Sequence, residues 1–365
     1  MINAKQTLAA IGMLLVLMCP AAAQEQTSDP AIEKILQAAI AEHGYPGLVA
    51  AIAKADEPIR IGAAGVRKHG DDEPITIHDK LHLGSDTKAI TATMIARLVE
   101  RGEISWDTTA EQVLPKKIIN KIHPSFHDVT IEELLTHRSG VPNGAKNWWK
   151  VGPKRLTDLR GQIMVESLAE PSKIKRGEYE YSNLGYMIAG LMVATKKQTT
   201  WEALIKREIF KPLKITSGGF GPPGKKGKVN QPWGHLNSAP LQHDNAPALG
   251  PAGTIHLSMS DWARFCLQHT DSSDEEFLKP ESRKSLHTPA QGGDYAKGWG
   301  VYPRRDGKGI ELRHAGSNTM WFSLAVVEPQ ASTAYLVVTN TAPKNAGPVS
   351  NTIIEQLRHL DRPEE

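Results

Sequence analysis

The hydrophobic positions predict a helix near the start of the chain, followed by a pair of strands. Residues 29–43 carry apolar side chains at the spacing of one helical face, with Asp29 as the cap and Pro30 in the first turn. The apolar residues on this face are Ile32, Ile35, Leu36, Ala39 and Ile40. Two short apolar runs, 48–53 and 59–66, are separated by the turn-forming sequence Asp-Glu-Pro, and they predict a hairpin.

The stretch from Leu81 to Val99 predicts a helix of a different kind. A short apolar segment leads into the turn Gly84-Ser85, and the residues after it are apolar around most of the helical circumference. The pattern ends at Arg101-Gly102. A helix that is apolar nearly all round is typical of a large core. We therefore expect this helix to be buried and central.

The middle of the chain predicts more helices and a long loop. Thr130 and Glu133 have the spacing of a capping box, which begins a helix within 129–137. Further helical patterns cover 161–168, 183–195 and 200–210, whereas 218–234 is rich in Gly, Pro and Lys and predicts a loop.

The final third returns to strand-length apolar runs and closes with a helix. The runs are 298–302, 310–314, 320–327 and 334–339, and the helix covers 349–360. Strands at both ends predict an α+β fold, in which an antiparallel sheet is flanked by terminal helices and interrupted by a large, mainly helical insertion. The sheet part is expected at about 30–84 and 250–360, and the helical part at about 85–249.

The first residues predict export. Residues 1–23 combine a basic start at Lys5, an apolar run and a small-residue cleavage site ending at Ala23. This arrangement is typical of a cleaved secretory signal, so we expect a periplasmic or secreted protein that begins at residue 24. Met18 and Pro20 flank Cys19 in a way that fits a lipid-attachment site poorly, and no stable membrane anchor is expected.

Charge and cysteine content narrow the picture further. The chain of 365 residues has a formal net charge of +3 and no basic block, which argues against nucleic acid as a partner. Cleavage of the signal leaves Cys266 as the one cysteine, so an internal disulfide is excluded. Its helix-like apolar surroundings indicate an inert core residue.

Ser85 and Lys88 form the first candidate catalytic pair. Three residues apart at the start of a helix, their side chains lie on the same face. A serine hydroxyl becomes a nucleophile when a neighbour accepts its proton, and a buried lysine with a lowered pKa can do so. The chain holds a second Ser-x-x-Lys, Ser172 to Lys175, but its polar surroundings without an apolar helix indicate solvated surface.

Two further short motifs carry chemistry of the same type. Tyr181 and Asn183 precede an apolar helix; a tyrosine can serve as a base, and an asparagine can hold a substrate amide. The sequence His314-Ala-Gly316-Ser317 follows a predicted strand. Gly316 lets a substrate lie close to the strand edge, and the Ser317 N–H can donate to an oxyanion.

These motifs, in this order, resemble the serine hydrolases of the penicillin-binding protein and class C β-lactamase superfamily, which includes D-alanyl-D-alanine peptidases and family VIII esterases. The resemblance extends from about Ile35 to Leu357. It includes Gly84 to Lys88, Leu98 to Gly102, Leu134 to Gly140, Tyr181 to Tyr186, Ile209 to Leu213, Gly250 to Gly253 with Ser260-Asp261, and His314 to Gly316. It implies one serine hydrolase domain over 24–365, built as a penicillin-binding-protein-like α+β fold.

The resemblance also implies a role for each motif residue. Ser85 would be acylated, Lys88 and Tyr181 would move its proton, and Asn183 would bind the substrate amide. His314 would occupy the third-motif position, Gly316 would lie beside the substrate, and the N–H groups of Ser85 and Ser317 would form the oxyanion hole. No metal or organic cofactor is implied. The third motif is His-Ala-Gly where β-lactamases usually have Lys-Thr-Gly, which resembles the peptidase and esterase branches and argues against efficient β-lactamase activity.

Other signals predict little chemistry. Gly219 to Gly224 matches a dinucleotide-binding pattern, but its two prolines and the absence of a following helix contradict that function. His123 and His127 have a possible metal spacing within a predicted loop and are expected to be a solvated pair. The lysines at 225, 226 and 228 indicate an exposed loop, and there is no Gly-x-Ser-x-Gly nucleophile motif.

The sequence therefore predicts an exported serine hydrolase that works through an acyl-enzyme. The substrate is expected to be a small ester, a D-amino-acid peptide or a β-lactam-like amide, including peptidoglycan fragments, with a carboxypeptidase or esterase favoured. The alternative is a penicillin-binding sensor or peptidoglycan-recognition module with little turnover. Substrate choice is expected to lie in the loops 143–159 and 220–245, with Trp148, Trp149 and Trp233 as candidates for the pocket wall.

Overall fold

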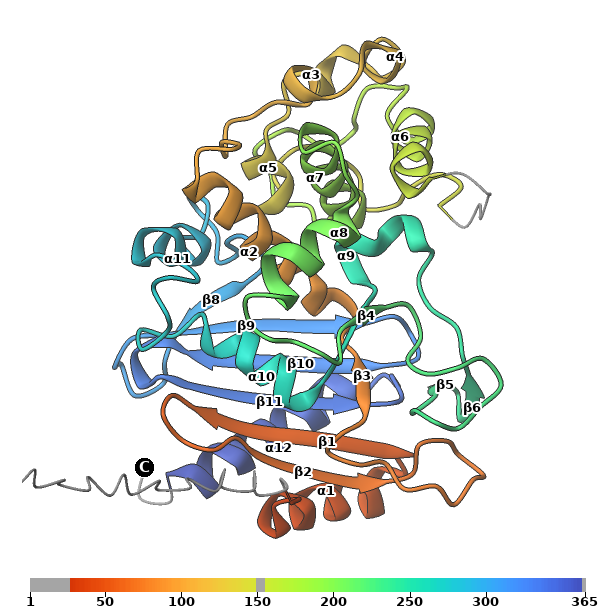
Figure 1. Cartoon of the computed structure of the whole chain (residues 1–365), viewed down its shortest axis with the longest axis vertical. Helices are drawn as coiled ribbons and strands as arrows, with labels where there is room; N and C mark the ends of the chain where they lie inside the picture. Colours follow the sequence, from red (N-terminus) through yellow and green to blue (C-terminus); the bar gives the residue numbers. More distant parts are fainter. Residues whose placement is uncertain (1–26, 149–154, 363–365) are drawn as a thin grey trace, which may run out of the picture.

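A six-stranded antiparallel sheet forms the centre of the computed structural model, which describes residues 27–148 and 155–362 (Figure 1). The strand order is β2-β1-β11-β10-β9-β8, so two strands from the start of the chain join four from its end. Their bounds are β1 Gly47–Lys54, β2 Arg60–Gly65, β8 Gly300–Pro303, β9 Ile310–Ser317, β10 Phe322–Glu328 and β11 Thr333–Thr339. The predicted sheet, built from both ends of the chain, is confirmed.

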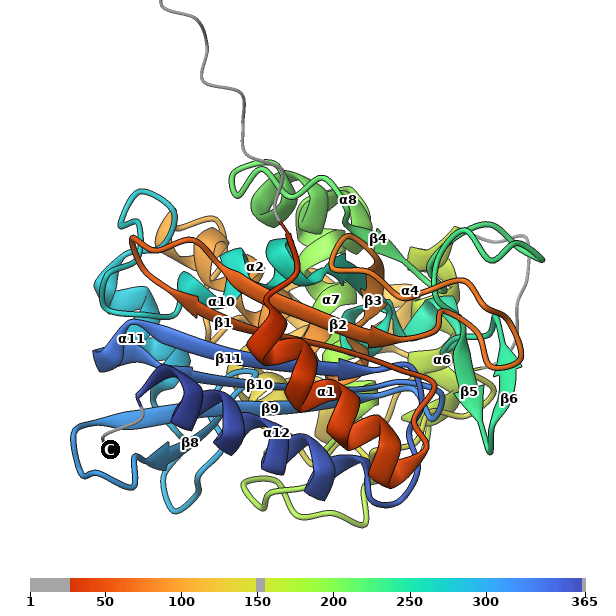
Figure 2. The same ribbon diagram turned by 90° about the horizontal axis from the view of Figure 1, so that it is seen from below.

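Two terminal helices, α1 Pro30–His43 and α12 Ala346–Asp361, cover one face of this sheet (Figure 2). Leu36 of α1 and Ile353 of α12 share one buried cluster with Leu48 of β1 and Val337 of β11. The predicted cap is present, because the Asp29 carboxylate accepts hydrogen bonds from the first backbone N–H groups of α1. The amphipathic patterns of the two helices are explained by their position on the sheet.

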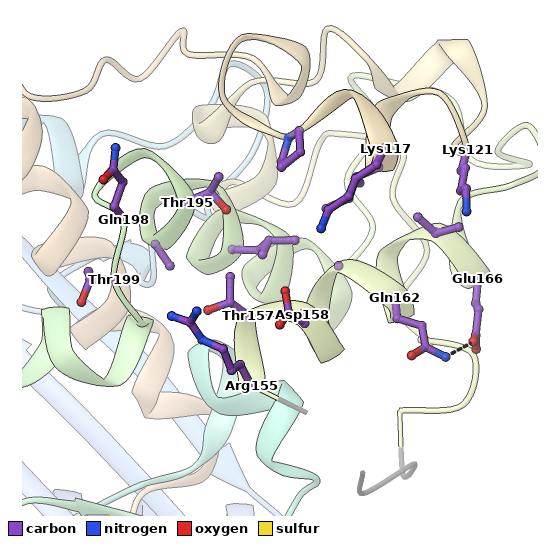
Figure 3. A pocket seen from close by; sticks show the side chains of 16 residues that line it. Lys117, Lys121, Arg155, Thr157, Asp158, Gln162, Glu166, Thr195, Gln198 and Thr199 are labelled. Carbon is purple, nitrogen blue, oxygen red and sulfur yellow. Dashed lines mark hydrogen bonds between the residues drawn. The ribbon is translucent and has the colours of Figure 1, made fainter. Parts of the chain in front are cut away.

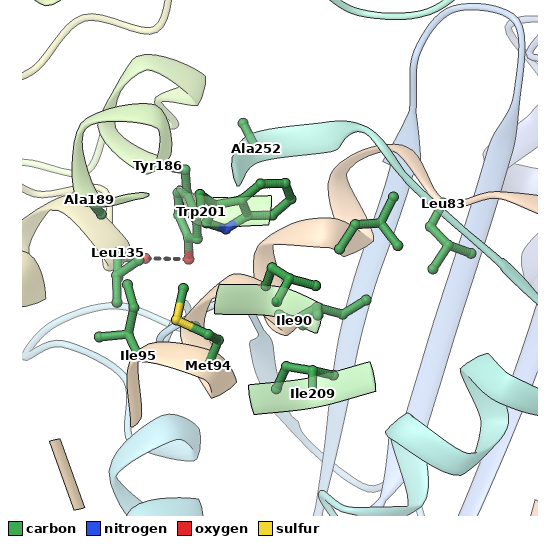
Figure 4. Close-up of a cluster of buried hydrophobic side chains, with 14 of the residues drawn as sticks. Leu83, Ile90, Met94, Ile95, Leu135, Tyr186, Ala189, Trp201, Ile209 and Ala252 are labelled. Atoms are coloured by element: carbon green, nitrogen blue, oxygen red, sulfur yellow. Dashed lines mark hydrogen bonds between the residues drawn. The ribbon is translucent and has the colours of Figure 1, made fainter. Parts of the chain in front are cut away.

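The opposite face of the sheet carries the helical part, with α2 Thr87–Glu100 at its centre. Ile90, Met94 and Ile95 of α2 are fully buried. Figure 4 shows them within a cluster that also contains Tyr186 and Trp201 from other helices. The expectation that a helix apolar on nearly all sides lies in the core is confirmed.

The remaining elements surround α2 or connect to the sheet. The helices are α3 Ala110–Val113, α4 Lys116–Ile119, α5 Ile131–Leu135, α6 Leu156–Ser167, α7 Asn183–Lys196, α8 Trp201–Ile205, α9 Gly250–Gly253, α10 Met259–Leu267 and α11 Pro280–His287. A π-helical turn, Lys206–Phe210, continues α8. Two small sheets contain β3 Lys80–His82, β7 Ile255–Ser258 and β4 Gly219–Phe220, and β5 Gly234–Leu236 with β6 Ala239–Leu241.

The structure differs from the sequence prediction at two segments. Helix α6 begins at Leu156 instead of residue 161. Its first turns contain the completely buried Arg160, which contacts Glu202 at 2.6 Å and the carbonyl of Ala248 at 2.9 Å. An apolar pattern does not reveal a helix that buries a paired charge. The predicted loop 218–234 contains strand β4, where Gly219 pairs with His256 of β7.

The structure bears on the predicted cysteine and leaves the export signal untested. Cys266 is buried in α10 as a free thiol, which agrees with an inert core residue. Within 27–148 and 155–362, no helix is both long and apolar enough to cross a membrane. The predicted signal at 1–23 and Cys19 lie outside the described residues, as does Trp149.

A buried histidine pair predicts a loss of stability in acid. His269, which follows the end of α10, lies 2.9 Å from His287 of α11 and 3.1 Å from Thr93 of α2. Burial lowers the pKa of His269 well below its usual range and that of His287 to about 3. Both rings are therefore neutral in the folded state but protonate below about pH 6.5 in the unfolded chain, so stability is complete above that pH and decreases as pH falls.

We expect the free energy of unfolding to fall by about 1.4 kcal/mol per pH unit for each of these histidines between about pH 6.5 and pH 4. Denaturant titrations at several pH values measure this slope. His287→Gln, which keeps a polar partner for His269, is expected to have a shallower slope than the wild type. An identical slope in the variant would show that other groups cause the acid sensitivity.

Candidate active site

Ser85 lies in a tight turn that is pressed against the edge of the sheet. The 3₁₀ turn Gly84–Asp86 leads directly into α2, which places Ser85 where the helix leaves backbone N–H groups unpaired. Gly84 has a φ of +49°, and a Cβ atom on it would stand 2.4 Å from the backbone N of Ser317. A Cβ on Gly316 would stand 1.9 Å from the carbonyl oxygen of Leu83 and 2.9 Å from the Ser85 N. The two segments approach this closely because both are glycine at the contact.

Replacing Gly316 by alanine is expected to damage both stability and activity. The added methyl group would overlap the Leu83 carbonyl, so β9 or the Ser85 turn must move. We expect a destabilisation of about 2 kcal/mol or more, measured by denaturant unfolding, and a loss of any activity that depends on Ser85 in the fraction that remains folded. Gly347→Ala is the matched control, since its Cβ would meet only a Phe322 ring atom at 3.7 Å. Equal stability of the two variants would contradict the close approach.

Lys88 is fully buried beside Ser85. Its Nζ lies 3.1 Å from Ser85 Oγ and 2.8 Å from each of two acceptors, the Asn183 side-chain oxygen and the Ala252 carbonyl. Burial lowers the pKa of Lys88 well below its usual range, although the nearby Asp86 opposes this effect. A neutral amine has two N–H groups and one lone pair. With both N–H groups donated to the two acceptors, the lone pair is left for the Ser85 hydroxyl.

Tyr181 lies above Lys88 and next to Ser85. The Lys88 Nζ is 4.7 Å from the centre of the Tyr181 ring, and the tyrosine hydroxyl interacts with the Ser85 side chain. Burial raises the pKa of Tyr181, whereas the contact with Ser85 opposes that shift. Burial thus favours the uncharged form of both groups, the protonated phenol of Tyr181 and the neutral amine of Lys88. Both side chains lie beside the Ser85 hydroxyl.

Tyr181 is held by α7 and by a buried histidine. Ser182 caps α7 through a hydrogen bond from the Gly185 N–H, so Tyr181 stands just outside the helix. The Ser182 N–H donates to His137 Nδ1 at 3.0 Å, and the His137 ring packs 4.4 Å from the Tyr181 ring. His137 is almost completely buried and has a φ of +61°. The sequence analysis placed His137 in a family motif without assigning it this contact.

Asn183 contacts Asn143, a residue that was predicted only as part of a loop. Its side-chain oxygen accepts from Lys88, and its Nδ2 donates to Asn143 Oδ1 at 3.2 Å. Asn143 also accepts from the Asn183 backbone N–H at 3.2 Å. In this structure Asn183 therefore orients Lys88, and its predicted contact with a substrate amide stays a prediction.

His314 of β9 faces Asp86, the residue that follows Ser85. Its Nδ1 lies 3.2 Å from Asp86 Oδ1, and its Nε2 lies 3.1 Å from the Tyr295 hydroxyl. Asp86 is buried, and its other oxygen accepts from the Ser323 hydroxyl of β10. Burial raises the pKa of the Asp86 carboxyl, while His314 and Ser323 oppose the shift. Asp86 was not predicted as a site residue; an acidic residue at the start of a buried apolar helix was the available signal.

A second histidine–carboxylate pair supports the same turn from behind. His82 is completely buried at the end of β3, and its Nδ1 accepts from the Gly84 N–H at 3.1 Å. Its Nε2 lies 2.8 Å from Asp244 Oδ1, which also accepts from Asn318 Nδ2 at 2.9 Å. Asp244 belongs to the loop 220–245, which was expected to influence substrate choice, and His82 connects this loop to the Ser85 turn.

A cavity of about 650 Å³ opens beside Tyr181 and His314. Its wall also contains Tyr295, Tyr302 and Ala315. Of the tryptophans predicted to form the pocket wall, Trp148 packs against the core and Trp233 lies under Lys68, 5.0 Å from the ring centre. Neither lines this cavity, whose aromatic wall consists of tyrosines.

A larger cavity of about 990 Å³ lies elsewhere, between α4, α6 and α7 (Figure 3). Lys117, Gln162 and Thr195 line it, and no residue of the Ser85 site does. Among the described residues there is no group of three or more His, Cys, Asp or Glu placed to hold a metal, and His123 bonds to Ser125 instead of approaching His127. The second Ser-x-x-Lys is not assembled into a site, because Ser172 donates to the Gly140 carbonyl.

Comparison with known proteins finds one family over almost the whole chain. The family described as Beta-lactamase matches residues 32–358. Penicillin-binding protein 4 of Amycolatopsis lactamdurans is 26% identical over 239 residues, which are 63% of this chain and 61% of that protein. The chain therefore spans about three fifths of the length of such curated relatives.

Solved structures share the fold at low sequence identity. The D-amino acid amidase of Ochrobactrum anthropi SV3 superposes with a TM-score of 0.74 at 19% identity, over 92% of this chain and 98% of that chain. A class C beta-lactamase of Rhodobacter sphaeroides has a TM-score of 0.71 at 17% identity, over 91% and 99% of the two chains. At these identities the likeness concerns the fold, and it agrees with the predicted α+β architecture.

Proposed function

The chain belongs to the Beta-lactamase family, and on that basis we propose that it is an exported serine hydrolase that forms an acyl-enzyme at Ser85. The observation that carries this proposal is the geometry of Lys88. Its Nζ lies 2.8 Å from Asn183 Oδ1, 2.8 Å from the Ala252 carbonyl oxygen and 3.1 Å from Ser85 Oγ, so a neutral amine that donates to the first two acceptors has its lone pair available to the Ser85 hydroxyl. A buried neutral amine in this position is a base for the serine proton.

Acylation follows from this arrangement. Ser85 Oγ attacks the substrate carbonyl as its proton passes to Lys88 Nζ, and the carbonyl oxygen becomes an oxyanion. The backbone nitrogens of Ser85 and Ser317 both lie at the close approach of the two segments, and their N–H groups are proposed to hold this oxyanion. As the bond to the leaving group breaks, Tyr181 donates its proton to that group and recovers one from Lys88.

Deacylation uses the same groups with water. A water molecule gives a proton to the neutral Lys88 amine and attacks the acyl carbon, and as the ester bond breaks Ser85 recovers that proton from Lys88 and the acid is released. The proposed substrates are small esters and D-amino-acid amides or peptides, with carboxypeptidase or esterase activity favoured over efficient β-lactamase activity. Fold relatives named as an amidase and a beta-lactamase support acyl transfer as the chemistry.

The test is turnover combined with a mass measurement. The mature protein is incubated with 4-nitrophenyl acetate, and release of nitrophenol is followed while intact mass is recorded. Continuous release with a transient acetyl adduct on Ser85 supports a hydrolase. One equivalent of release followed by a stable adduct would favour the sensor alternative, and no release or adduct would contradict the proposal.

Export is a separate part of the proposal and rests on residues 1–23. Expression of the full chain in a Gram-negative host, followed by fractionation, should place the protein in the periplasm with a mass that begins at residue 24. Full-length protein in the cytoplasm would contradict it.

A further inference from the structure

Both ring nitrogens of His314 already have partners within the protein. His314 is buried, and its two ring nitrogens face Asp86 at 3.2 Å and the Tyr295 hydroxyl at 3.1 Å. Tyr295 is itself buried and interacts with the Tyr186 hydroxyl, which donates to the Leu135 carbonyl. Neither nitrogen of His314 is therefore directed at the cavity, although the ring contributes to its wall.

The Asp86–His314 pair carries no net positive charge. With the carboxylate ionised, the pair is neutral when the imidazole is protonated and negative when it is not. A neutral carboxyl beside a protonated imidazole would leave an uncompensated buried cation, which is the costly state. Since Asp86 is only 2% exposed, water does not screen the charge of this pair.

The other cations around Ser85 and the cavity also have partners. Lys88 is committed to Ser85, Asn183 and Ala252. The Arg313 guanidinium lies 2.9 Å from Glu311 and bonds to Asn351, and Arg305 lies 3.2 Å from Glu355. Ala315, which lines the cavity between His314 and Gly316, has no hydroxyl to offer. Among the described residues of this cavity, no unpaired cation is available to a carboxylate.

We propose that Asp86 is a specificity-determining residue that makes the site select substrates without a negative charge beside the scissile bond. This inference rests on the proposed serine hydrolase function and narrows its substrate class to esters and amides with an uncharged leaving group. Of the two activities favoured above it selects the esterase, because a carboxypeptidase substrate carries a free carboxylate next to the scissile bond. A carboxylate placed next to the scissile bond would meet the Asp86–His314 pair, lose its hydration and gain no counter-charge. An amide or alkyl group in the same place loses far less.

Two aryl acetates that differ in one group test the selectivity. 3-Acetoxybenzamide and 3-acetoxybenzoate present the same ester with a neutral or an anionic leaving group. For each ester, kcat/KM is divided by the rate constant of its hydrolysis by hydroxide. We expect this ratio in the wild-type protein to be at least about tenfold higher for the benzamide. Equal values, or a preference for the benzoate, would overturn the inference. Hydrolysis of neither ester would instead overturn the proposed function.

Variants test the role of Asp86. Asp86→Asn replaces the carboxylate that faces His314 by an amide of the same shape, so the benzamide-to-benzoate ratio is expected to fall by about tenfold. A purely structural role would lower both rates by the same factor and leave the ratio unchanged, which would overturn the assignment. Asp86→Ser, which keeps a partner for Ser323, is the second variant and must lower the ratio too.

The matched control is Asp261→Asn. Asp261 is also buried, but it accepts from the backbone of Thr216 and Ser217 and pairs with Arg264, away from the cavity. We expect this variant to keep the wild-type ratio whatever happens to its stability. A ratio that falls equally in the Asp261 variant would show that the change comes from general loosening and would overturn the role of Asp86.

Discussion

Replacing Ser85 by alanine is expected to lower kcat/KM for 4-nitrophenyl acetate by about 10³-fold or more and to abolish the acyl adduct. The hydroxyl is the atom that forms the covalent bond, and no other group in the site replaces it. The fold should survive, because Ser85 is partly exposed and its side chain loses only its contacts with Lys88 and Tyr181. Intact mass and a thermal melt of the same sample measure both results.

The second Ser-x-x-Lys provides the matched control. Ser172→Ala removes a hydroxyl that donates to the Gly140 carbonyl and makes no contact with Ser85 or Lys88. We expect this variant to keep full activity and to form the adduct. If Ser85→Ala kept more than about a tenth of the activity, or if Ser172→Ala lost it, the assignment of the nucleophile would be wrong.

Replacing Lys88 by methionine is expected to lower activity strongly and to change the free energy of unfolding only slightly. We expect kcat/KM to fall by about 10³-fold, since the Ser85 proton then has no base with a lowered pKa. The free energy of unfolding should change by no more than about 2 kcal/mol, because two effects oppose each other. The acceptors Asn183 and Ala252 lose a donor, but the cost of burying an amine is removed.

The lowered pKa of Lys88 makes the stability of the wild-type protein depend on pH. Unfolded lysine has a pKa of about 10.4, and burial lowers that of Lys88, so below about pH 10.4 burial of the amine costs the folded protein stability. That cost decreases as pH rises toward about 10.4. The variant should therefore gain stability relative to the wild type most clearly at neutral and acidic pH, which denaturant titrations at pH 6 and pH 9 compare.

Two substitutions sharpen the interpretation. Lys88→Arg keeps a cation that does not lose its proton, so it is expected to be as inactive as Lys88→Met. Lys175→Met, in the exposed Ser-x-x-Lys, should leave activity unchanged. An active Lys88→Arg variant would show that a positive charge, rather than a base, is what Ser85 requires.

Three of the residues singled out in the sequence, Ser85, Lys88 and Tyr181, are neighbours in the folded chain. Ser85 and Lys88 are three residues apart on one helix, and helical geometry alone makes their side chains neighbours. Tyr181 stands immediately before α7, as predicted, and α7 packs close to α2, which brings its hydroxyl to Ser85. The catalytic roles of these residues remain proposals that the variants above test.

Other contacts of the site join residues that no local pattern connects. Asp86 meets His314, His82 meets Asp244, and Asn183 meets Asn143. Each pair comes from two elements distant in sequence, and each member alone has the appearance of an ordinary polar residue. The same reason explains why α6 was predicted too short, since Arg160 is recognisable as a core residue only when Glu202 is beside it.

The sequence by itself determined the elements and the positions of the candidate chemistry. Periodicity is a local property, and it places the buried α2, the terminal helices and the strands at both ends of the chain. Only the tertiary structure decided the electrostatics of the site. Whether His314 offers a charge to a substrate depends on Asp86 and Tyr295, which packing brings to its two nitrogens. Charge balance in a buried site is set by distances between elements, and those distances exist only in the folded chain.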